Sequence, residues 1–213
     1  MKELSATVFV VDDDAEVRKS LVRLLKSAGY STEAFASADE FLASWQLNRV
    51  PGCVVLDILM PGIDGLQLQQ KLQAAPDGVP IIFITGHGDI PSSVAAMKAG
   101  AVDFFPKPFN DEDLLGAVRE AIQRNAQERS KRAERDAVAG RFRELTPRER
   151  EVMALVVRGM LNKQIAAVLG ASEKTIKVHR GRVMEKMQVQ SLADLVRAAE
   201  KIGLRPGFTL PSA

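Results

Sequence analysis

The sequence predicts an α/β fold, in which a doubly wound, five-stranded parallel sheet is followed by a small all-α segment. Five apolar runs, rich in β-branched and aromatic residues, recur about every twenty residues, and each precedes a segment with helical spacing. Charge separates the two parts. Residues 1–123 contain 10 Lys and Arg and 17 Asp and Glu, a net charge of −7, whereas residues 124–213 contain 19 and 10, a net charge of +9. A chain of 213 residues is long enough for two domains.

The five apolar runs are the expected strands. They are 7–11 (TVFVV), 31–36 (STEAFA), 53–57 (CVVLD), 79–85 (VPIIFIT) and 101–105 (AVDFF). In the helix expected after the first run, Val17, Leu21 and Leu25 share one face. Near-continuous apolar strands that alternate with helices indicate a parallel sheet covered on both faces, because right-handed crossovers place the helices there.

Polar residues follow four of these runs. They are Asp12 and Asp13 after the first, Asp57 at the end of the third, Thr85 at the end of the fourth and Lys107 after the fifth. In doubly wound sheets, ligands bind outside the carboxyl ends of the strands, where the strand order reverses. Each residue taken singly fits a solvated loop, but their arrival at one edge is hard to explain by stability alone. The sequence therefore predicts a functional site at this edge.

Three of these residues are carboxylates, and their repulsion must be offset. Two carboxylates about 4 Å apart repel by about 4 kcal/mol at the effective dielectric of partly buried sites. Mg²⁺ would offset it, because this ion prefers oxygen ligands and is commonly held by one or two carboxylates beside phosphate oxygens. The absence of Cys and His from these positions argues against zinc. One carboxylate could then attack a phosphoryl group, while Lys107 and Thr85 bind its oxygens.

The N-terminal motifs together resemble the receiver domain of two-component response regulators. They are VVDDD (10–14), LDILMPGIDG (56–65), FITGHGD (83–89) and FFPKPF (104–109), within a resemblance that spans residues 6 to about 123. The resemblance implies a flavodoxin-like fold, with Asp57 as the phosphoacceptor and Asp13 as a direct Mg²⁺ ligand. It also implies that Asp12 is a second acidic contributor and that the backbone carbonyl of Leu59 completes the metal shell. Asp14 has no expected ligand role.

The same resemblance implies a conformational switch. Phosphorylation would draw the Thr85 hydroxyl inward, and Phe104 would rotate into the space released, which would alter the fourth helix (about 91–99) and the fifth strand. Simple core packing is the alternative for Phe104. The resemblance also implies a cis peptide bond before Pro108. His87 lies where the family tunes the phosphate lifetime, with a histidine on a surface loop as the alternative.

Residues 124–143 are expected to be a charged linker, set between a receiver domain at 1–123 and a third region at 144–213. The linker contains no proline, and good helix formers dominate until Gly140. We therefore expect the last receiver helix to continue outward as an exposed helix. Its apolar content is too low for a stable coiled coil, with weak pairing in a dimer as the alternative.

The third region, 144–213, is expected to form a small helical domain. Thr146 can cap a helix that starts with proline and has Glu149 three residues after the cap, which is a capping box. A second helix is expected to stop at Gly170, and a third to begin after its cap, Ser172. Two short helices joined by a tight turn suggest a helix-turn-helix, although glycine turns between helices are common.

The third of these helices is strongly basic. Five basic side chains are expected on its outer surface: Lys174, Lys177, Arg180, Arg182 and Lys186. Six apolar side chains of the second and third helices are expected in the core: Ile165, Val168, Leu169, Ile176, Val183 and Met187. A solvated basic helix would show the same pattern. The charge of this half and a geometry that would insert the helix N-terminus into a major groove favour DNA.

The segment from LTPREREVM through ASEKTIKVHRGRVMEKM, 144 to about 199, resembles the LuxR/FixJ-type DNA-binding domain over nearly its full length. The resemblance places the recognition helix at about 173–187, with Lys177 and Val178 toward base edges. The other residues expected near the DNA backbone or groove are Asn162, Lys163, Lys174, Thr175, His179, Arg180 and Arg182. The final helix, about 191–202, commonly supplies dimer contacts in this family. Its candidates, with packing inside the domain as the alternative, are Leu192, Leu195 and Val196.

Together these features predict a cytoplasmic two-component response regulator that regulates transcription. We expect a sensor histidine kinase to phosphorylate Asp57, which would promote homodimerisation and binding to double-stranded promoter DNA, with the transcription machinery as a further partner. The receiver would catalyse only its own phosphorylation and dephosphorylation, so we do not expect a metabolic enzyme. No apolar stretch approaches the 18 residues that a membrane helix needs, and the single cysteine, Cys53, fits a reducing cytoplasm.

Two alternatives belong to other classes of protein. One is an aspartate-nucleophile phosphatase with a nucleic-acid tether. Such enzymes usually carry a DxDx(T/V) motif, whereas the stretch at the predicted acceptor reads LDILMP. The other is a DNA-binding protein whose receiver is structural and never phosphorylated, which the intact acidic cluster disfavours. The chain has no glycine-rich phosphate loop, so bound ATP or NAD is not expected.

Overall fold

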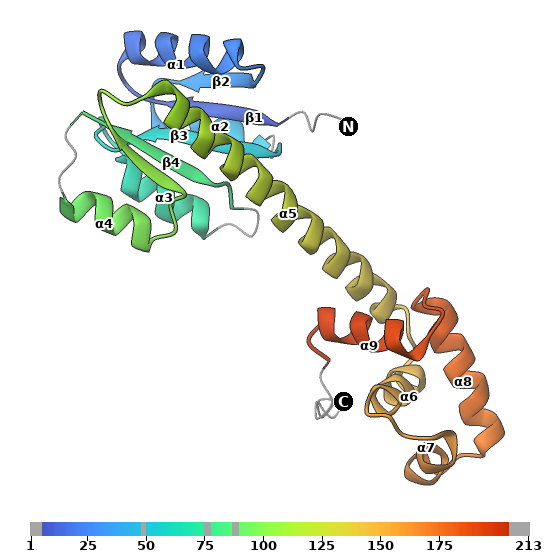
Figure 1. Ribbon diagram of the computed structural model, residues 1–213. Helices are drawn as coiled ribbons and strands as arrows, with labels where there is room; N and C mark the ends of the chain where they lie inside the picture. The colour runs from blue at the N-terminus through green and yellow to red at the C-terminus, as the bar shows by residue number, and fades with distance from the viewer. Residues whose placement is uncertain (1–5, 48–49, 75–77, 87–89, 205–213) are drawn as a thin grey trace. The chain divides into compact units, whose positions relative to one another are not determined.

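The structure is a computed structural model that describes residues 6–47, 50–74, 78–86 and 90–204 (Figure 1). The chain forms two compact units, Met1–Arg129 and Ser130–Ala213. One long helix, α5 (Asp111–Arg143), contributes residues to both units. Among the residues described, no helix combines the length and the apolar character that a membrane span requires.

The first unit contains a five-stranded sheet in which every neighbouring pair of strands is parallel (Figure 1). The strands are β1 (Thr7–Val11), β2 (Ser31–Phe35), β3 (Gly52–Asp57), β4 (Ile81–Thr85) and β5 (Asp103–Pro106). Their order across the sheet is β2-β1-β3-β4-β5. The predicted doubly wound sheet is therefore confirmed, and its order reverses between β1 and β3.

Two strands begin about two residues after their apolar runs begin. β4 starts after Pro80, which has no N–H group to donate to a neighbouring strand. Before β5, Ala101 N donates to Ala96 O at 3.1 Å and completes the end of the preceding helix, and the first hydrogen bond to β4 is that from Val102 N to Ile81 O at 2.8 Å. An apolar run marks which residues are buried, whereas hydrogen bonds decide where a strand begins.

Helices cover both faces of the sheet. They are α1 (Ala15–Ser27), α2 (Ala38–Leu47), α3 (Gly65–Gln73), α4 (Ile90–Lys98) and the first part of α5. On one face, Val10 of β1 lies in a core with Leu21 of α1 and Leu114 of α5. On the other face, Phe9 lies in a second core with residues of α2, α3 and α4, among them Leu68. Strands covered on both faces are apolar along their length.

The second unit is a group of short helices that follow α5. They are α6 (Pro147–Val157), α7 (Asn162–Leu169), α8 (Glu173–Lys186) and α9 (Leu192–Lys201). Thr146 and Glu149 form the predicted capping box. Gly170 ends α7 with a φ of 60°, and the Ser172 side chain caps α8 by accepting a hydrogen bond from Thr175 N. The predicted all-α domain with a helix-turn-helix is confirmed.

Three side chains of this unit do not lie where the sequence predicts. Val168 is expected in the core but is 61% exposed, because it lies off the face of α7 that buries both Ile165 and Ala166. Lys186 was expected on the outer surface, but its Nζ lies 2.7 Å from a carboxylate oxygen of the buried Glu149. Leu195 was a candidate for dimer contacts but is fully buried, so it packs within its own domain.

The C-terminal part of α5 belongs to the second unit. Val138 is buried and Phe142 is partly buried in the core of that unit. Glu134 Oε2 lies 2.7 Å from Lys201 Nζ of α9. The helix that follows the sheet continues through Gly140 and ends at Arg143. The residues of α5 after Arg129 thus contact α9 and contribute to the core of the helical unit.

Candidate functional site

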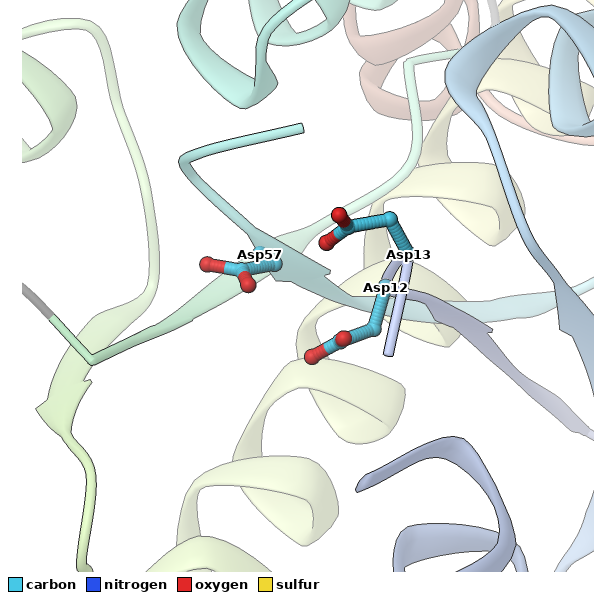
Figure 2. A group of neighbouring side chains, drawn as sticks. All are labelled: Asp12, Asp13 and Asp57. Carbon is cyan, nitrogen blue, oxygen red and sulfur yellow. The ribbon is translucent and has the colours of Figure 1, made fainter. Parts of the chain in front are cut away.

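Three aspartates gather at the carboxyl edge of the sheet, where β1 and β3 end (Figure 2). One carboxylate oxygen of each of Asp12, Asp13 and Asp57 lies within 4.8 Å of those of the other two. Asp12 is fully buried, Asp57 is 7% exposed and Asp13 is exposed. The fold therefore brings the predicted acidic group together between β1 and β3, where the strand order reverses.

The side chain of Lys107 connects two of these aspartates. Its Nζ donates hydrogen bonds to Asp12 Oδ2 at 2.7 Å and to Asp57 Oδ2 at 3.1 Å. Its backbone N–H donates to the carbonyl oxygen of Thr85 at 2.7 Å, which ties the end of β5 to the end of β4. The Lys107–Pro108 peptide bond is cis. An ammonium group between two carboxylates offsets part of their repulsion.

Burial and charge act in opposite directions on the ionisation of this group. Burial raises the pKa of Asp12 above its ordinary value, and the hydrogen bond from Lys107 offsets only part of that effect. Burial alone would lower the pKa of Lys107, but the hydrogen bonds and charges of Asp12 and Asp57 outweigh it and raise that pKa. Lys107 therefore stays protonated at neutral pH, where its ammonium lies between the side chains of Asp12 and Asp57.

The loop after β1 is held by two further side chains. Arg18 of α1 donates from Nη1 to the backbone carbonyl of Asp12 at 2.7 Å. Asp14 is the N-cap of α1, where its side chain accepts hydrogen bonds from the N–H groups of Glu16 and Val17, and these bonds lower the pKa of Asp14. An aspartate just before a helical run is a cap signal that the sequence does contain. Nothing in the local pattern around Arg18 identifies its partner.

Gly65, the first residue of α3, lets this helix begin directly against β3. A Cβ at position 65 would lie 2.3 Å from the carbonyl oxygen of Asp57 and 2.9 Å from the Cα of Ile58. The N–H of Gly65 donates to the carbonyl oxygen of Ile58 at 2.8 Å. The side chain of Asp64 then caps α3 by accepting a hydrogen bond from Gln67 N. No other residue fits at position 65 without a shift of the backbone.

The structure describes three of the other residues predicted for this site, namely Leu59, Thr85 and Phe104. Thr85 is fully buried at the end of β4. Leu59 N donates to Asp57 Oδ1 at 3.4 Å, and the Leu59 side chain is 56% exposed. Phe104 is partly buried and packs against the core that α2, α3 and α4 share. His87 lies outside the described residues.

The donor chemistry of the acidic group fits Mg²⁺. Its three side chains offer carboxylate oxygens, which are the hard ligands that this ion prefers. Asp13 is exposed, so the group is accessible to a hydrated ion that keeps several of its waters. The side chains that could hold the ion are those of Asp12, Asp13 and Asp57. The positive charge of the ion would add to that of the single Lys107 ammonium beside these three acidic groups.

The exposed face of α8 carries most of the residues predicted to contact DNA. On α8, the predicted DNA-contact residues with exposed side chains are Lys174, Thr175, Lys177, Val178 and Arg182. The opposite face of α8 buries Ile176 and Val183. Gly181 is also exposed, and a Cβ there would meet no atom within 4 Å. An exposed apolar residue, Val178, surrounded by basic side chains suits a major groove, where base edges and thymine methyl groups lie between phosphates.

The remaining predicted DNA contacts are placed differently. Arg180 Nη1 donates to Asn162 Oδ1 at 3.1 Å, so each of these side chains orients the other across α7 and α8. His179 is half-buried, and its Nδ1 is buried without a hydrogen-bond partner among the described residues. Lys163 is exposed near the start of α7. The two helices of the helix-turn-helix thus share one polar link.

Comparisons with known proteins find relatives for both units. Residues 8–119 match the family model for the response regulator receiver domain, and residues 143–199 match that for bacterial regulatory proteins of the luxR family. Nodulation protein W of Bradyrhizobium diazoefficiens is 48% identical over 204 residues, which cover 96% of this chain and 89% of that protein. The low-resolution structure of response regulator StyR is 50% identical, with a TM-score of 0.81 over 92% of this chain and 98% of StyR. Full-length FixJ from B. japonicum is 42% identical, with a TM-score of 0.56 over 94% of this chain and 98% of FixJ.

Proposed function

Because the chain belongs to the two-component response regulators that join a receiver domain to a LuxR-type DNA-binding domain, we propose that Asp57 accepts a phosphoryl group from a sensor histidine kinase. One observation carries the proposal: the ammonium of Lys107 lies 3.1 Å from Asp57 and 2.7 Å from Asp12, where the sheet order reverses. A fixed cation there can bind phosphoryl oxygens as they arrive. The protein is a transcription regulator and not an enzyme of metabolism, and we place its action in the cytoplasm.

The proposed transfer is a displacement at phosphorus. A carboxylate oxygen of Asp57 forms the new O–P bond as the bond from phosphorus to the imidazole nitrogen of the phosphohistidine breaks, and that nitrogen keeps the electron pair. Lys107 Nζ and the Thr85 hydroxyl donate hydrogen bonds to the phosphoryl oxygens. Water later attacks the acyl phosphate, which releases inorganic phosphate and restores the carboxylate. The receiver thus catalyses only its own modification.

The metal shell that we propose consists of Asp12, Asp13, Asp57 and the backbone carbonyl of Leu59. Bound Mg²⁺ would supply positive charge for phosphoryl oxygens that must approach these carboxylates. Arg18 holds the backbone carbonyl of Asp12, so the loop that carries Asp12 and Asp13 is positioned by the protein itself.

We propose that α4 and β5 respond to phosphorylation. Thr85 would move toward the phosphoryl group, and Phe104 would turn into the space that it leaves. Ile90, Val94 and Met97 of α4 are 79%, 44% and 44% exposed, at the spacing of one helix face. An apolar stripe exposed on a helix suits contact with a second copy of the chain. Dimerisation through this stripe would follow phosphorylation.

DNA binding belongs to the second unit. We propose that Lys177 and Val178 of α8 contact base edges in the major groove. The residues proposed to contact the DNA backbone or groove are Asn162, Lys163, Lys174, Thr175, His179, Arg180 and Arg182. A dimer would place two copies of α8 on two half-sites of a promoter, where the protein would act on the transcription machinery. Leu192, 40% exposed on α9, is a further candidate for a dimer contact.

Beryllofluoride, a mimic of the phosphoryl group, tests this proposal in the full chain with Mg²⁺. We expect the mass in solution, measured by analytical ultracentrifugation, to rise from monomer to dimer. Affinity for duplex DNA that the protein selects from a random pool should rise with it. Asp57→Asn is the control and should respond in neither measurement.

The outcomes separate the alternatives. Tighter DNA binding at constant mass would replace dimerisation by release of an inhibited DNA-binding unit. Sustained hydrolysis of a small phosphoester would favour the phosphatase alternative. If neither mass nor affinity changes, the receiver is structural and the proposal is wrong.

A further inference from the structure

Helix α4 is attached to the first unit by very little buried apolar surface. Of its residues, all of which the structure describes, Ala96 alone is buried, whereas Ile90 at its start is 79% exposed. The neighbouring helix α3 buries Leu68 and Leu72, which are 0% and 2% exposed. Elements with few buried apolar contacts lie at the low-stability end of a structure. Polar contacts must therefore contribute much of what fixes α4 in place.

The buried side chain of Gln69 on α3 makes such a contact. It is 1% exposed, and its Nε2 donates to the backbone carbonyl oxygens of Ala96 at 3.0 Å and Ala99 at 3.1 Å. Since both partners are carbonyl oxygens, the amide must present its NH₂ group to them. The Oε1 atom of Gln69 is buried and has no hydrogen-bond partner within the described part of the chain.

These hydrogen bonds hold the C-terminal end of α4. The last carbonyl groups of a helix have no partner inside the helix. The carbonyl oxygen of Ala96 also accepts a hydrogen bond from Ala101 N at 3.1 Å, so Gln69 adds to the cap that the chain itself forms. Hydrogen bonds are directional, so two hydrogen bonds donated by one NH₂ group favour a single position of the helix end.

Gln69 also lies on the helix that begins against the proposed acceptor. Gly65 starts α3 in contact with the carbonyl of Asp57, and Gln69 follows about one helical turn later. A single short helix therefore contacts Asp57 at its first residue and α4 at Gln69.

We infer that Gln69 is a positioning residue, whose two hydrogen bonds hold α4 in its arrangement before phosphorylation and oppose the rearrangement that phosphorylation favours. This inference rests on the proposed phosphorylation of Asp57 and adds the contact that resists the switch. A ligand shifts the equilibrium between two arrangements by binding one of them more tightly. A contact made in only one arrangement changes the populations of the two before the ligand binds. Without Gln69, less binding energy is needed to move α4.

Gln69→Met in the full chain tests this role. Methionine is unbranched and close in size, but it lacks both donors. Amide deuterium exchange over residues 90–101 is followed while beryllofluoride is titrated at a fixed Mg²⁺ concentration. Exchange without beryllofluoride should become faster at the end of α4. The half-saturating beryllofluoride concentration should fall by about 5- to 100-fold, which corresponds to the net loss of both Gln69 hydrogen bonds from the starting arrangement.

Gln70→Met is the matched control, because Gln70 is the next residue of α3 and is exposed. It should change neither readout, and Gln69→Leu should repeat the shift of Gln69→Met. Faster exchange at α4 with an unchanged or higher half-saturating concentration would show a merely structural role and overturn the inference. If beryllofluoride does not change the amide exchange of residues 90–101 in the wild-type chain, the proposed phosphorylation is overturned, and this inference with it.

Discussion

Gly65 lies so close to Asp57 that a Cβ on Gly65 would be 2.3 Å from the carbonyl oxygen of Asp57. This approach lets α3 start at the end of β3, directly beside the acidic group. Two hydrogen bonds complete the junction: the side chain of Asp64 accepts one from Gln67 N, and the backbone carbonyl of Ile58 accepts one from Gly65 N. The strand that carries Asp57 and the helix that carries Gln69 therefore depend on a position where no side chain fits.

Gly65→Ala is expected to lower the free energy of unfolding of the first unit by about 1–3 kcal/mol, the usual cost of adding atoms to a packed region. Urea unfolding followed by Trp45 fluorescence measures it, because this single tryptophan is 4% exposed in a core of that unit. Gly116→Ala is the control, since a Cβ at 116 would meet nothing within 4 Å. Equal unfolding midpoints for Gly65→Ala and the wild type would contradict the described packing.

Lys107→Ala is expected to slow phosphoryl uptake from acetyl phosphate by about 100-fold, the usual cost of removing one donor to a reacting group. The affinity for Mg²⁺ should rise, because a cation that competes for Asp12 and Asp57 is removed. A gel-shift assay for the phosphorylated chain gives the rate, and titration calorimetry gives the affinity. Lys98→Ala, at an exposed position of α4, should change neither. An unchanged uptake rate in Lys107→Ala would remove Lys107 from the mechanism.

The Glu149–Lys186 pair should make the second unit sensitive to acid. Burial alone would raise the pKa of Glu149, but the hydrogen bond from Lys186 and that from Thr146 N outweigh it, so this pKa lies below its ordinary value. The unfolded chain then binds the proton more tightly than the folded chain. The stabilisation is therefore complete well above the ordinary pKa of about 4.3, and it is lost as the pH falls through the lower, folded pKa.

We expect Glu149→Gln to lower the free energy of unfolding of this unit by about 1.5–3 kcal/mol at pH 7, the usual contribution of a hydrogen bond to a charged group. The variant should then lose less stability than the wild type on further acidification below about pH 5. Urea unfolding followed by circular dichroism, with Trp45 fluorescence reporting the first unit separately, gives both values. An identical pH dependence in the two proteins would contradict the role of this carboxylate.

Two exposed lysines should affect DNA binding in different ways. Lys177→Ala is expected to reduce discrimination at one base position by about 1–3 kcal/mol, because it removes a proposed base contact. Lys163→Ala should weaken binding to all sequences alike and reduce the slope of log K against log salt concentration by about 1, because it removes a proposed phosphate contact. Competition binding at several salt concentrations measures both. A loss of discrimination in Lys163→Ala but not in Lys177→Ala would reverse the assignment.

Much of the fold follows from the sequence because of the geometry of parallel sheets. Strands that run in the same direction must bring their carboxyl ends to one edge, so residues far apart in the chain, such as Asp12, Asp57 and Lys107, could be grouped from their positions after the apolar runs. Helix ends with strong local chemistry, such as the Thr146 cap and the Gly170 stop, could be placed in the same way.

Contacts between helices could not be predicted in this way. The partners of Arg18 and Gln69 are backbone carbonyl groups, which every residue has, so the sequence does not point to them. Residue type alone also misplaces Val168 and Lys186, because valine suggests burial and lysine suggests full exposure. The direction of each side chain around its helix instead leaves Val168 exposed and brings Lys186 to the buried Glu149.

The most direct test of this account is phosphoryl uptake by the full chain from acetyl phosphate in the presence of Mg²⁺, measured on the wild type, Asp57→Asn and Asp39→Asn. Asp39 is an exposed residue in the first turn of α2 and serves as the control. We predict that the wild type and Asp39→Asn become phosphorylated at the same rate and that Asp57→Asn takes up no phosphoryl group. Undiminished uptake by Asp57→Asn would contradict the assignment of Asp57 as the acceptor.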